Sequence, residues 1–101
     1  MANIYNTTLV SVTTTGSNVI VYTSPGKTIV RDVAIYAKGT TPTVSTLYND
    51  RTSTLVLDQT TLTTSATHRP FATPLGMPNA HEILVNTSAE VNVLITYVEF
   101  D

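Results

Sequence analysis

The sequence predicts an all-β protein: a single antiparallel β-sandwich, jelly-roll-like or Ig-like, with about 7–8 short strands and no substantial helix. Three observations support this prediction. About a fifth of the 101 residues are threonine, and valine and isoleucine are also plentiful, so side chains that suit strands dominate. No stretch shows convincing helical periodicity. Turn signals recur at intervals of about 8–12 residues, which is typical of a sandwich or barrel.

The first part of the chain divides into strands joined by short turns. β-branched and apolar residues mark the strands, and clusters of Gly, Pro, Asn and Asp mark the turns. We expect strands at residues 4–13, 19–23, 28–37, 43–48 and 52–58. We expect the turns between them at residues 16–18, 25–26, 38–42 and 49–51.

The second part of the chain is interrupted by prolines. Residues 60–73 leave room for one more strand, and residues 70–79 form a proline-rich stretch. A hairpin follows, with strands at 82–86 and 90–100 joined by a turn at 87–89. We expect one face of its second strand to point to the core, and that face carries Val91, Val93, Ile95 and Tyr97. Pairing should be mostly antiparallel, because no helices supply crossover connections.

Arg31 interrupts the alternation of the third expected strand. Ile29, Val33 and Ile35 share one face of a regular strand, and Arg31 falls on that same face. Two explanations are open. A β-bulge shifts the register here, or the guanidinium reaches an edge of the sandwich or a partner protein. We therefore expect Val33 and Ile35 in the core and keep Arg31 as a candidate interface residue.

The tripeptide Gly26-Lys27-Thr28 is also how a phosphate-binding loop ends. Such a loop needs another glycine five positions earlier, where this chain has Val21, and it opens a helix. A β-branched run follows instead. Pro25-Gly26 fits a type II turn, in which proline sets the second position and glycine supplies a positive φ at the third. We expect Lys27 to be an exposed turn residue without a nucleotide-binding role.

Composition excludes several classes of function. The formal net charge is −2 and only 12% of the residues are charged, so no basic patch could follow a nucleic-acid backbone. The absence of cysteine excludes disulfides and thiolate metal sites. Neither a signal peptide nor an apolar run of membrane-spanning length is visible, so we expect no membrane partner and synthesis in the cytoplasm of the host cell.

The sequence offers little site chemistry. His68 and His81 could share a metal ion only if they met in the fold, and solvent-facing loop histidines are the alternative. Four tyrosines could line a sugar-binding groove, with packing or rim positions as the alternative: Tyr22, Tyr36, Tyr48 and Tyr97. No nucleophile motif or catalytic spacing is present. We therefore expect no enzyme activity and assign no catalytic, cofactor-binding or metal-binding residue.

Two long segments resemble one group of known proteins. The segment VIVYTSPGKTIVRDVAIYAKGTTPTVSTLY, residues 19–48, resembles the front half of small β-sandwich structural proteins of tailed-phage virions. The segment LGMPNAHEILVNTSAEVNVLITYVEF, residues 75–100, resembles their closing hairpin. His81-Glu82 stands where that group usually has Gly-Asp, which affects the local turn more than the fold.

The resemblance implies a part in virion assembly. Such proteins are capsid decoration (cement) proteins or small head, neck and tail components. The leading interpretation is a decoration protein on the capsid exterior, in contact with the major capsid protein or other virion proteins. We expect a homo-oligomer, with a trimer favoured because capsid axes support symmetric clusters. The alternatives are a neck or tail component and a carbohydrate-binding module of a tail fibre or adhesin.

The candidate contact residues come from a possible N-terminal contact arm at residues 1–5 of the single domain, the third strand and the proline-rich stretch. Prolines in residues 71–79 would reduce the entropy lost when apolar side chains there bind a partner. The alternative for that stretch is that its apolar side chains close one end of the sandwich as core residues. The full set is Ala2, Asn3, Ile4, Tyr5, Arg31, Phe71, Leu75 and Met77.

Overall fold

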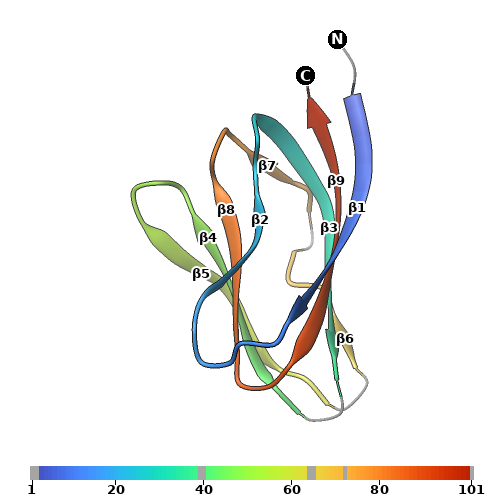
Figure 1. Ribbon diagram of the computed structural model, residues 1–101, viewed down its shortest axis with the longest axis vertical. Helices are drawn as coiled ribbons and strands as arrows, with labels where there is room; N and C mark the ends of the chain where they lie inside the picture. Colours follow the sequence, from blue (N-terminus) through green and yellow to red (C-terminus); the bar gives the residue numbers. More distant parts are fainter. Residues whose placement is uncertain (1–2, 39–40, 64–65, 72, 101) are drawn as a thin grey trace.

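The chain folds into two antiparallel sheets that pack face to face (Figure 1). The computed structural model describes residues 3–38, 41–63, 66–71 and 73–100, and these ranges contain nine strands. They contain no helix that could span a membrane. The all-β sandwich predicted from the sequence is confirmed.

Sheet A has five strands, with β9 (Val91–Phe100) in its middle. β9 pairs antiparallel with β1 (Asn3–Val12) on one side and with β3 (Lys27–Ala37) on the other. The second edge of β3 pairs with two short strands, β6 (Thr67–His68) and β7 (Leu75–Met77).

Sheet B has four strands, and every neighbouring pair is antiparallel. Its order is β2 (Val19–Thr23), β8 (Glu82–Thr87), β4 (Thr43–Asn49) and β5 (Thr54–Thr61). β2 and β5 are therefore the two edge strands. The β4–β5 hairpin extends to one side of the molecule in Figure 1.

The two inner faces form the core. Val33, Ile35, Val93 and Ile95 are at most 1% exposed, as the alternation of the third and last strands predicted. Sheet B contributes Val44, Ile83 and Val85, which are equally buried and belong to the same cluster. The core is built of β-branched side chains on both sides, which pack well on a pleated surface.

A β-bulge at Arg31 decides which side chains of β3 enter the core. Val30 lies opposite Tyr97 and Asp32 lies opposite Thr96, so Arg31 is the extra residue and its side chain is exposed. The bulge explanation is therefore confirmed. The shift also places Thr28 and Val30 in the interior and leaves Ile29 37% exposed. The expectation that Ile29 shares the buried face of Val33 and Ile35 was wrong, because simple alternation does not continue through a bulge.

Two local predictions need correction. β7 lies inside the proline-rich stretch, where no strand was expected, and with the two-residue β6 it explains why nine strands form. Gly26 is not among the positive-φ residues of the described ranges, so the type II turn at Pro25-Gly26 is wrong. Lys27 is exposed as expected, but it begins β3 instead of lying in the turn.

Buried hydroxyl groups close the end of the sandwich near the β2–β3 connection. The Tyr22 hydroxyl donates to Glu99 Oε2 at 2.8 Å and also lies 3.0 Å from Thr28 Oγ1. Ser24 Oγ donates to the carbonyl of Gly26 and lies 2.9 Å from the same Thr28 oxygen. Burial raises the pKa of Tyr22 above its ordinary value; the hydrogen bond to Thr28 opposes this rise and the hydrogen bond to Glu99 adds to it.

Candidate interaction surfaces

Large exposed apolar side chains are concentrated on β5. Leu55, Val56 and Leu57 are 55%, 62% and 42% exposed, and they follow one another in the chain. A run of three exposed apolar residues is unusual on a soluble surface unless it serves contact with another molecule. The other large apolar residues in this class are scattered over three strands: Leu9, Ile20 and Ile29.

The position of β5 at the end of sheet B explains this exposure. β5 pairs with β4 along one edge, and none of the described strands pairs with its other edge. A second bulge adds to the exposure: Thr46 pairs with Asp58 and Leu47 pairs with Val56, so Leu57 has no residue opposite it. An edge strand with unpaired backbone groups and apolar side chains is a site for strand pairing with another chain.

One half of β5 is held to sheet A and the other half is free. Asp58 Oδ2 lies 2.7 Å from His68 Nε2, an interaction that links β5 to β6. The apolar run, residues 55–57, precedes Asp58 in the chain and lies between Asp58 and the β4–β5 turn. The exposed segment is thus anchored at one end by a contact between the sheets.

The hairpin turn that leads into β5 is fixed by local hydrogen bonds. Asp50 Oδ1 accepts from the backbone N–H groups of Thr52 and Ser53 at 2.9 and 2.8 Å. These bonds lower the pKa of Asp50 below its ordinary value. Arg51 adopts a left-handed φ of 77°. The turn is therefore well defined although it projects from the sheet.

Val56 also ends an apolar row across the outer face of sheet B. Successive register pairs join the residues of all four strands at one level: Ile20 with Leu84, Leu84 with Leu47, and Leu47 with Val56. Paired residues lie on the same face of a sheet. Leu84 and Leu47 are buried within the row, whereas both of its ends are exposed. The apolar row therefore reaches both edges of sheet B.

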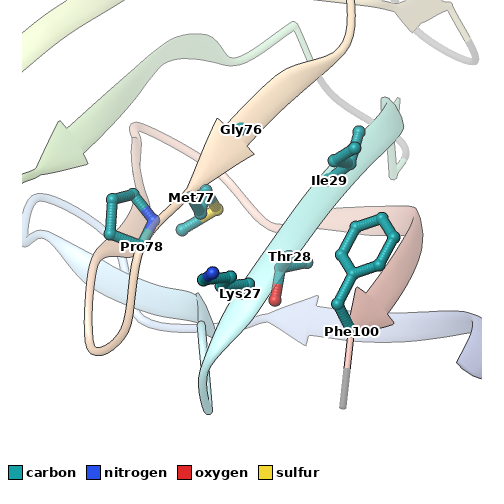
Figure 2. Close-up of a pocket in the computed structure, with 7 residues that line it drawn as sticks. All are labelled: Lys27, Thr28, Ile29, Gly76, Met77, Pro78 and Phe100. Atoms are coloured by element: carbon teal, nitrogen blue, oxygen red, sulfur yellow. The ribbon is translucent and has the colours of Figure 1, made fainter. Parts of the chain in front are cut away.

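A second apolar surface is an open groove on sheet A of about 440 Å³. Figure 2 shows Ile29 and Phe100 on one side and Gly76, Met77 and Pro78 on the other. Its lining also includes Lys27 and Thr28 at the start of β3. The groove is shallow and mainly apolar, and few polar groups are present that could orient a small ligand.

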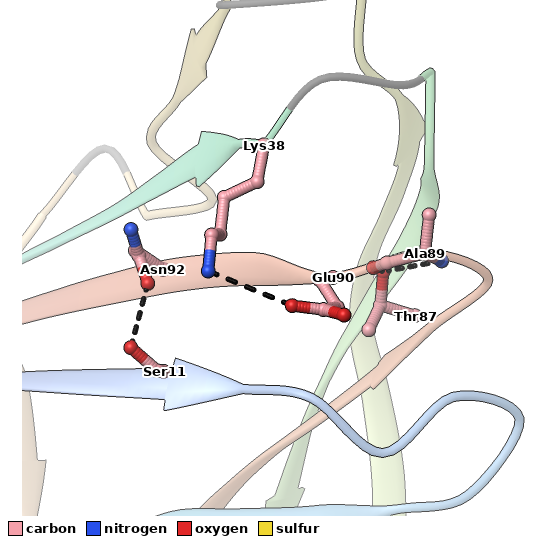
Figure 3. A network of polar contacts seen from close by, with 6 residues as sticks. All are labelled: Ser11, Lys38, Thr87, Ala89, Glu90 and Asn92. Carbon is pink, nitrogen blue, oxygen red and sulfur yellow. Dashed lines mark hydrogen bonds and ion pairs between the residues drawn. The ribbon is translucent and has the colours of Figure 1, made fainter.

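The opposite end of the molecule is polar. Lys38 Nζ lies 3.5 Å from Glu90 Oε1, and Ser11 Oγ donates to Asn92 Oδ1 at 2.8 Å (Figure 3). Thr87 Oγ1 donates to the carbonyl of Ala89 within the β8–β9 turn. These contacts stabilise the turns at this end of the molecule, and Lys38, Ala89 and Glu90 also line an open pocket of about 480 Å³.

The predicted contact residues of the N-terminal segment belong to a strand. Asn3, Ile4 and Tyr5 pair with Phe100, Glu99 and Val98, so this part of the segment is an end of sheet A and not a separate arm. Ala2 lies outside the described residues. Whether this strand end contacts a partner stays a prediction.

The other predicted contact residues differ in access. Arg31 is exposed at the bulge, where it is available to a partner. Phe71 and Leu75 are partly buried and pack against the core, and Met77 is only 2% exposed. Met77 therefore closes the sandwich as a core residue, which was the alternative considered for this stretch. Leu75 pairs with Val30, the neighbour of Arg31, so the register brings Leu75 and Arg31 close together on sheet A.

The two histidines have different partners, and two of the four tyrosines considered from the sequence are buried. His68 contacts Asp58, whereas His81 Nδ1 is hydrogen-bonded to the Tyr48 hydroxyl. The described residues contain no group of three or more His, Cys, Asp or Glu side chains placed to hold a metal ion. Tyr22 and Tyr97 are buried with ring centroids 4.7 Å apart, so these two cannot line an open sugar groove.

Sequence reasoning did not select the apolar run of β5. The segment was correctly expected to be a strand, but its accessibility depends on its place at the end of sheet B. One signal was available: Leu55, Val56 and Leu57 break the alternation that a half-buried strand requires.

Comparison with known proteins gives likeness at the level of the fold. Neither a known protein family nor a curated protein sequence matches the chain. A chain from the disulfide-linked pili of Bacillus endospore appendages superposes with a TM-score of 0.56 at 10% identity, over 95% of this chain and 84% of that one. A chain from the virus-like particle of the extra small virus of the prawn Macrobrachium rosenbergii gives a TM-score of 0.44 at 18% identity, over 100% and 82%. The first likeness agrees with the β-sandwich fold.

Proposed function

We propose that this protein is a non-enzymatic structural subunit of a phage virion, bound to the capsid exterior as a decoration protein that stabilises the head. The observation that carries the proposal is the free edge of β5, with its three consecutive exposed apolar residues. In a protein that acts as a monomer, such an edge promotes aggregation. In a subunit of an assembly, it provides a surface for contact with the neighbouring subunit.

The low charge of the chain supports the same proposal. Only 12% of the residues are charged, and β5 carries one charged residue, Asp58, which already has His68 as its partner. Contact between such surfaces requires little desolvation of charge. Thr-rich strands also give a stiff body, since β-branched side chains have few χ1 rotamers to lose.

The likenesses to assembled proteins support a structural role. Residues 19–48 and 75–100 resemble small structural proteins of tailed-phage virions. The pilus chain with the similar fold comes from an assembly that is disulfide-linked, whereas this chain has no cysteine. Copies of this protein are therefore proposed to be held by noncovalent contacts, in which β5 takes part.

The test is to locate and count the protein in purified phage particles. Quantitative mass spectrometry gives its copy number relative to the major capsid protein, and a reconstruction gives its positions. We expect many equivalent positions across the shell. Density confined to the portal vertex or the tail would contradict the decoration role and leave a neck or tail component. Absence from the particle would refute the proposal altogether.

A pair of variants connects this test to β5. Leu55→Ser should reduce the number of copies on the particle, because Leu55 belongs to the apolar run. Leu9→Ser is the matched control on the edge strand of the other sheet, with a similarly exposed leucine. Equal occupancy of both variants would show that β5 does not carry the contact.

A further inference from the structure

We infer that the free edge of β5 pairs antiparallel with β5 of a second copy. The twofold axis that relates the two copies passes between their Val56 residues. The pairing joins two four-stranded B sheets into one continuous sheet. The inference rests on the proposed structural role and names the partner of β5 as the chain itself.

The sequence of the exposed run suits such a pairing. Leu55-Val56-Leu57 reads the same in both directions. In a twofold antiparallel pair centred on Val56, Leu55 of each copy lies opposite Leu57 of the other. Val56 of one copy lies opposite Val56 of the other. All three cross-strand pairs are then apolar, and side chains in such opposed positions contact each other directly.

The residues that flank the run are compatible with this register. Thr54 of one copy lies opposite Asp58 of the other, so no like charges meet across the new pair. Asp58 keeps His68 as its partner within its own chain. The register therefore leaves the contact between β5 and β6 in place.

The apolar row on the outer face supports the same axis. Val56 is the exposed end of the row that begins at Ile20 and passes through Leu84 and Leu47. A twofold axis at Val56 joins the rows of two copies end to end and covers the more exposed end of each. The joined row would cross the outer face of the combined sheet without a polar interruption.

The other edge strands fit β5 less well. β2 would also run antiparallel to β5 in a head-to-tail arrangement, but it exposes one large apolar residue, Ile20, whereas β5 exposes three. A pair of β5 strands therefore covers more exposed apolar surface than β5 paired with β2. β1 belongs to the edge of sheet A and, among its described side chains, exposes one large apolar residue, Leu9.

The contact is short, and this sets its expected strength. The bulge at Leu57 lies inside the paired run, where it adds twist and keeps the regular pairing short. An interface below about 1,200 Å² is typical of weak, transient complexes. We therefore expect a weak dimer in dilute solution, favoured where many copies are held close together.

Cysteine trapping tests the register, because the chain has no cysteine of its own. Val56→Cys places one thiol beside its counterpart in the paired state, within reach of a disulfide after a small adjustment. Leu9→Cys is the matched control, since Leu9 is 61% exposed on another edge strand. Under mild oxidation we expect Val56→Cys to form the covalent dimer about 10-fold faster or more, as measured on non-reducing gels.

Charge exchange gives an independent test of the twofold axis. Val56→Lys alone and Val56→Glu alone should each remain monomeric in sedimentation velocity, because like charges then oppose each other. An equal mixture of the two should recover the dimer, because Lys then faces Glu. Melting temperatures close to that of the unchanged protein would establish that both variants fold, as expected for an exposed position.

Three results would overturn the inference: equal rates for Val56→Cys and Leu9→Cys, no recovery in the Lys and Glu mixture, or preferred cross-linking between Val56→Cys and Ile20→Cys chains. The last would indicate head-to-tail pairing of β5 with β2. These outcomes are separate from those of the proposed function. If the protein decorates phage heads but fails the trapping test, the proposed function stands and the β5–β5 contact is refuted. If the trapping test succeeds but the protein is absent from phage particles, the contact stands and the proposed function is refuted.

Discussion

The bulge at Arg31 predicts that two isoleucines of one strand differ in their contribution to stability. Ile35 is 0% exposed, and its replacement by alanine deletes core atoms and leaves a cavity, at a cost of about 2–5 kcal/mol. Ile29 is 37% exposed on the other face. Ile29→Ala removes three carbons that are about two-thirds buried, and it leaves no closed cavity. At about 0.8 kcal/mol per buried CH₂, this substitution lowers the free energy of unfolding by about 1.5 kcal/mol.

Thermal unfolding of the two variants checks this difference. For a domain of about this size, 1 kcal/mol corresponds to about 4–8 °C in melting temperature. We expect Ile35→Ala to lower the melting temperature by about 8–40 °C and Ile29→Ala by about 6–12 °C. The pair is matched because strand, residue type and substitution are the same. Equal losses would show that both side chains share one face, which would refute the register shift at Arg31.

Three further predictions concern Tyr22, Arg51 and Gly16. Folded Tyr22 keeps its proton above about pH 10, where unfolded Tyr22 loses it, so its stabilising contribution falls as the pH rises. Tyr22→Phe should be less stable than the unchanged protein at pH 8, and urea unfolding should show this gap narrowing above pH 10; a constant gap would contradict the coupling. Arg51→Gly should be neutral or stabilising by up to about 1 kcal/mol, because glycine adopts a φ of 77° without strain. Gly16→Ala, at a φ of 75° with no neighbour close to the added methyl group, should instead lose about 1 kcal/mol in the same assay.

Much of the fold could be predicted because its longest strands carry their own pattern. The alternation of Val91, Val93, Ile95 and Tyr97 fixed both the existence of β9 and its inner face. The second strand was also predicted with its observed bounds, Val19–Thr23. These are local signals, since the side-chain period of two is visible without knowing the partner strands.

Features that depend on distant parts of the chain could not be predicted in the same way. β7 is held by pairing with Thr28 to Val30, and the prolines on either side of it, Pro74 and Pro78, hide the strand signal. The bulge was recognised as one explanation for Arg31, but its effect on Ile29 required the register with β9.

The candidate site could be predicted only in part. Arg31 was selected and is exposed, whereas Met77 was selected and is buried. The run at Leu55 was not selected, because whether an apolar strand lies inside a sheet or at its edge is decided by topology. The local sequence shows which side chains a strand carries on each face. The order of the strands in the sheet decides which of those side chains stay exposed to solvent.

The central place of β9 also has a consequence for how the chain folds. β1 and β3 both pair with β9 and not with each other, so neither has its main sheet neighbour until residues 91–100 have been synthesised. Residues as far apart as Asn3 and Phe100 must meet before sheet A is complete. Contacts of such high sequence separation slow folding and leave strand edges uncovered in incomplete chains. Sheet A is therefore expected to form only after synthesis of β9, and chains that stop before β9 should depend on chaperones to stay out of aggregates.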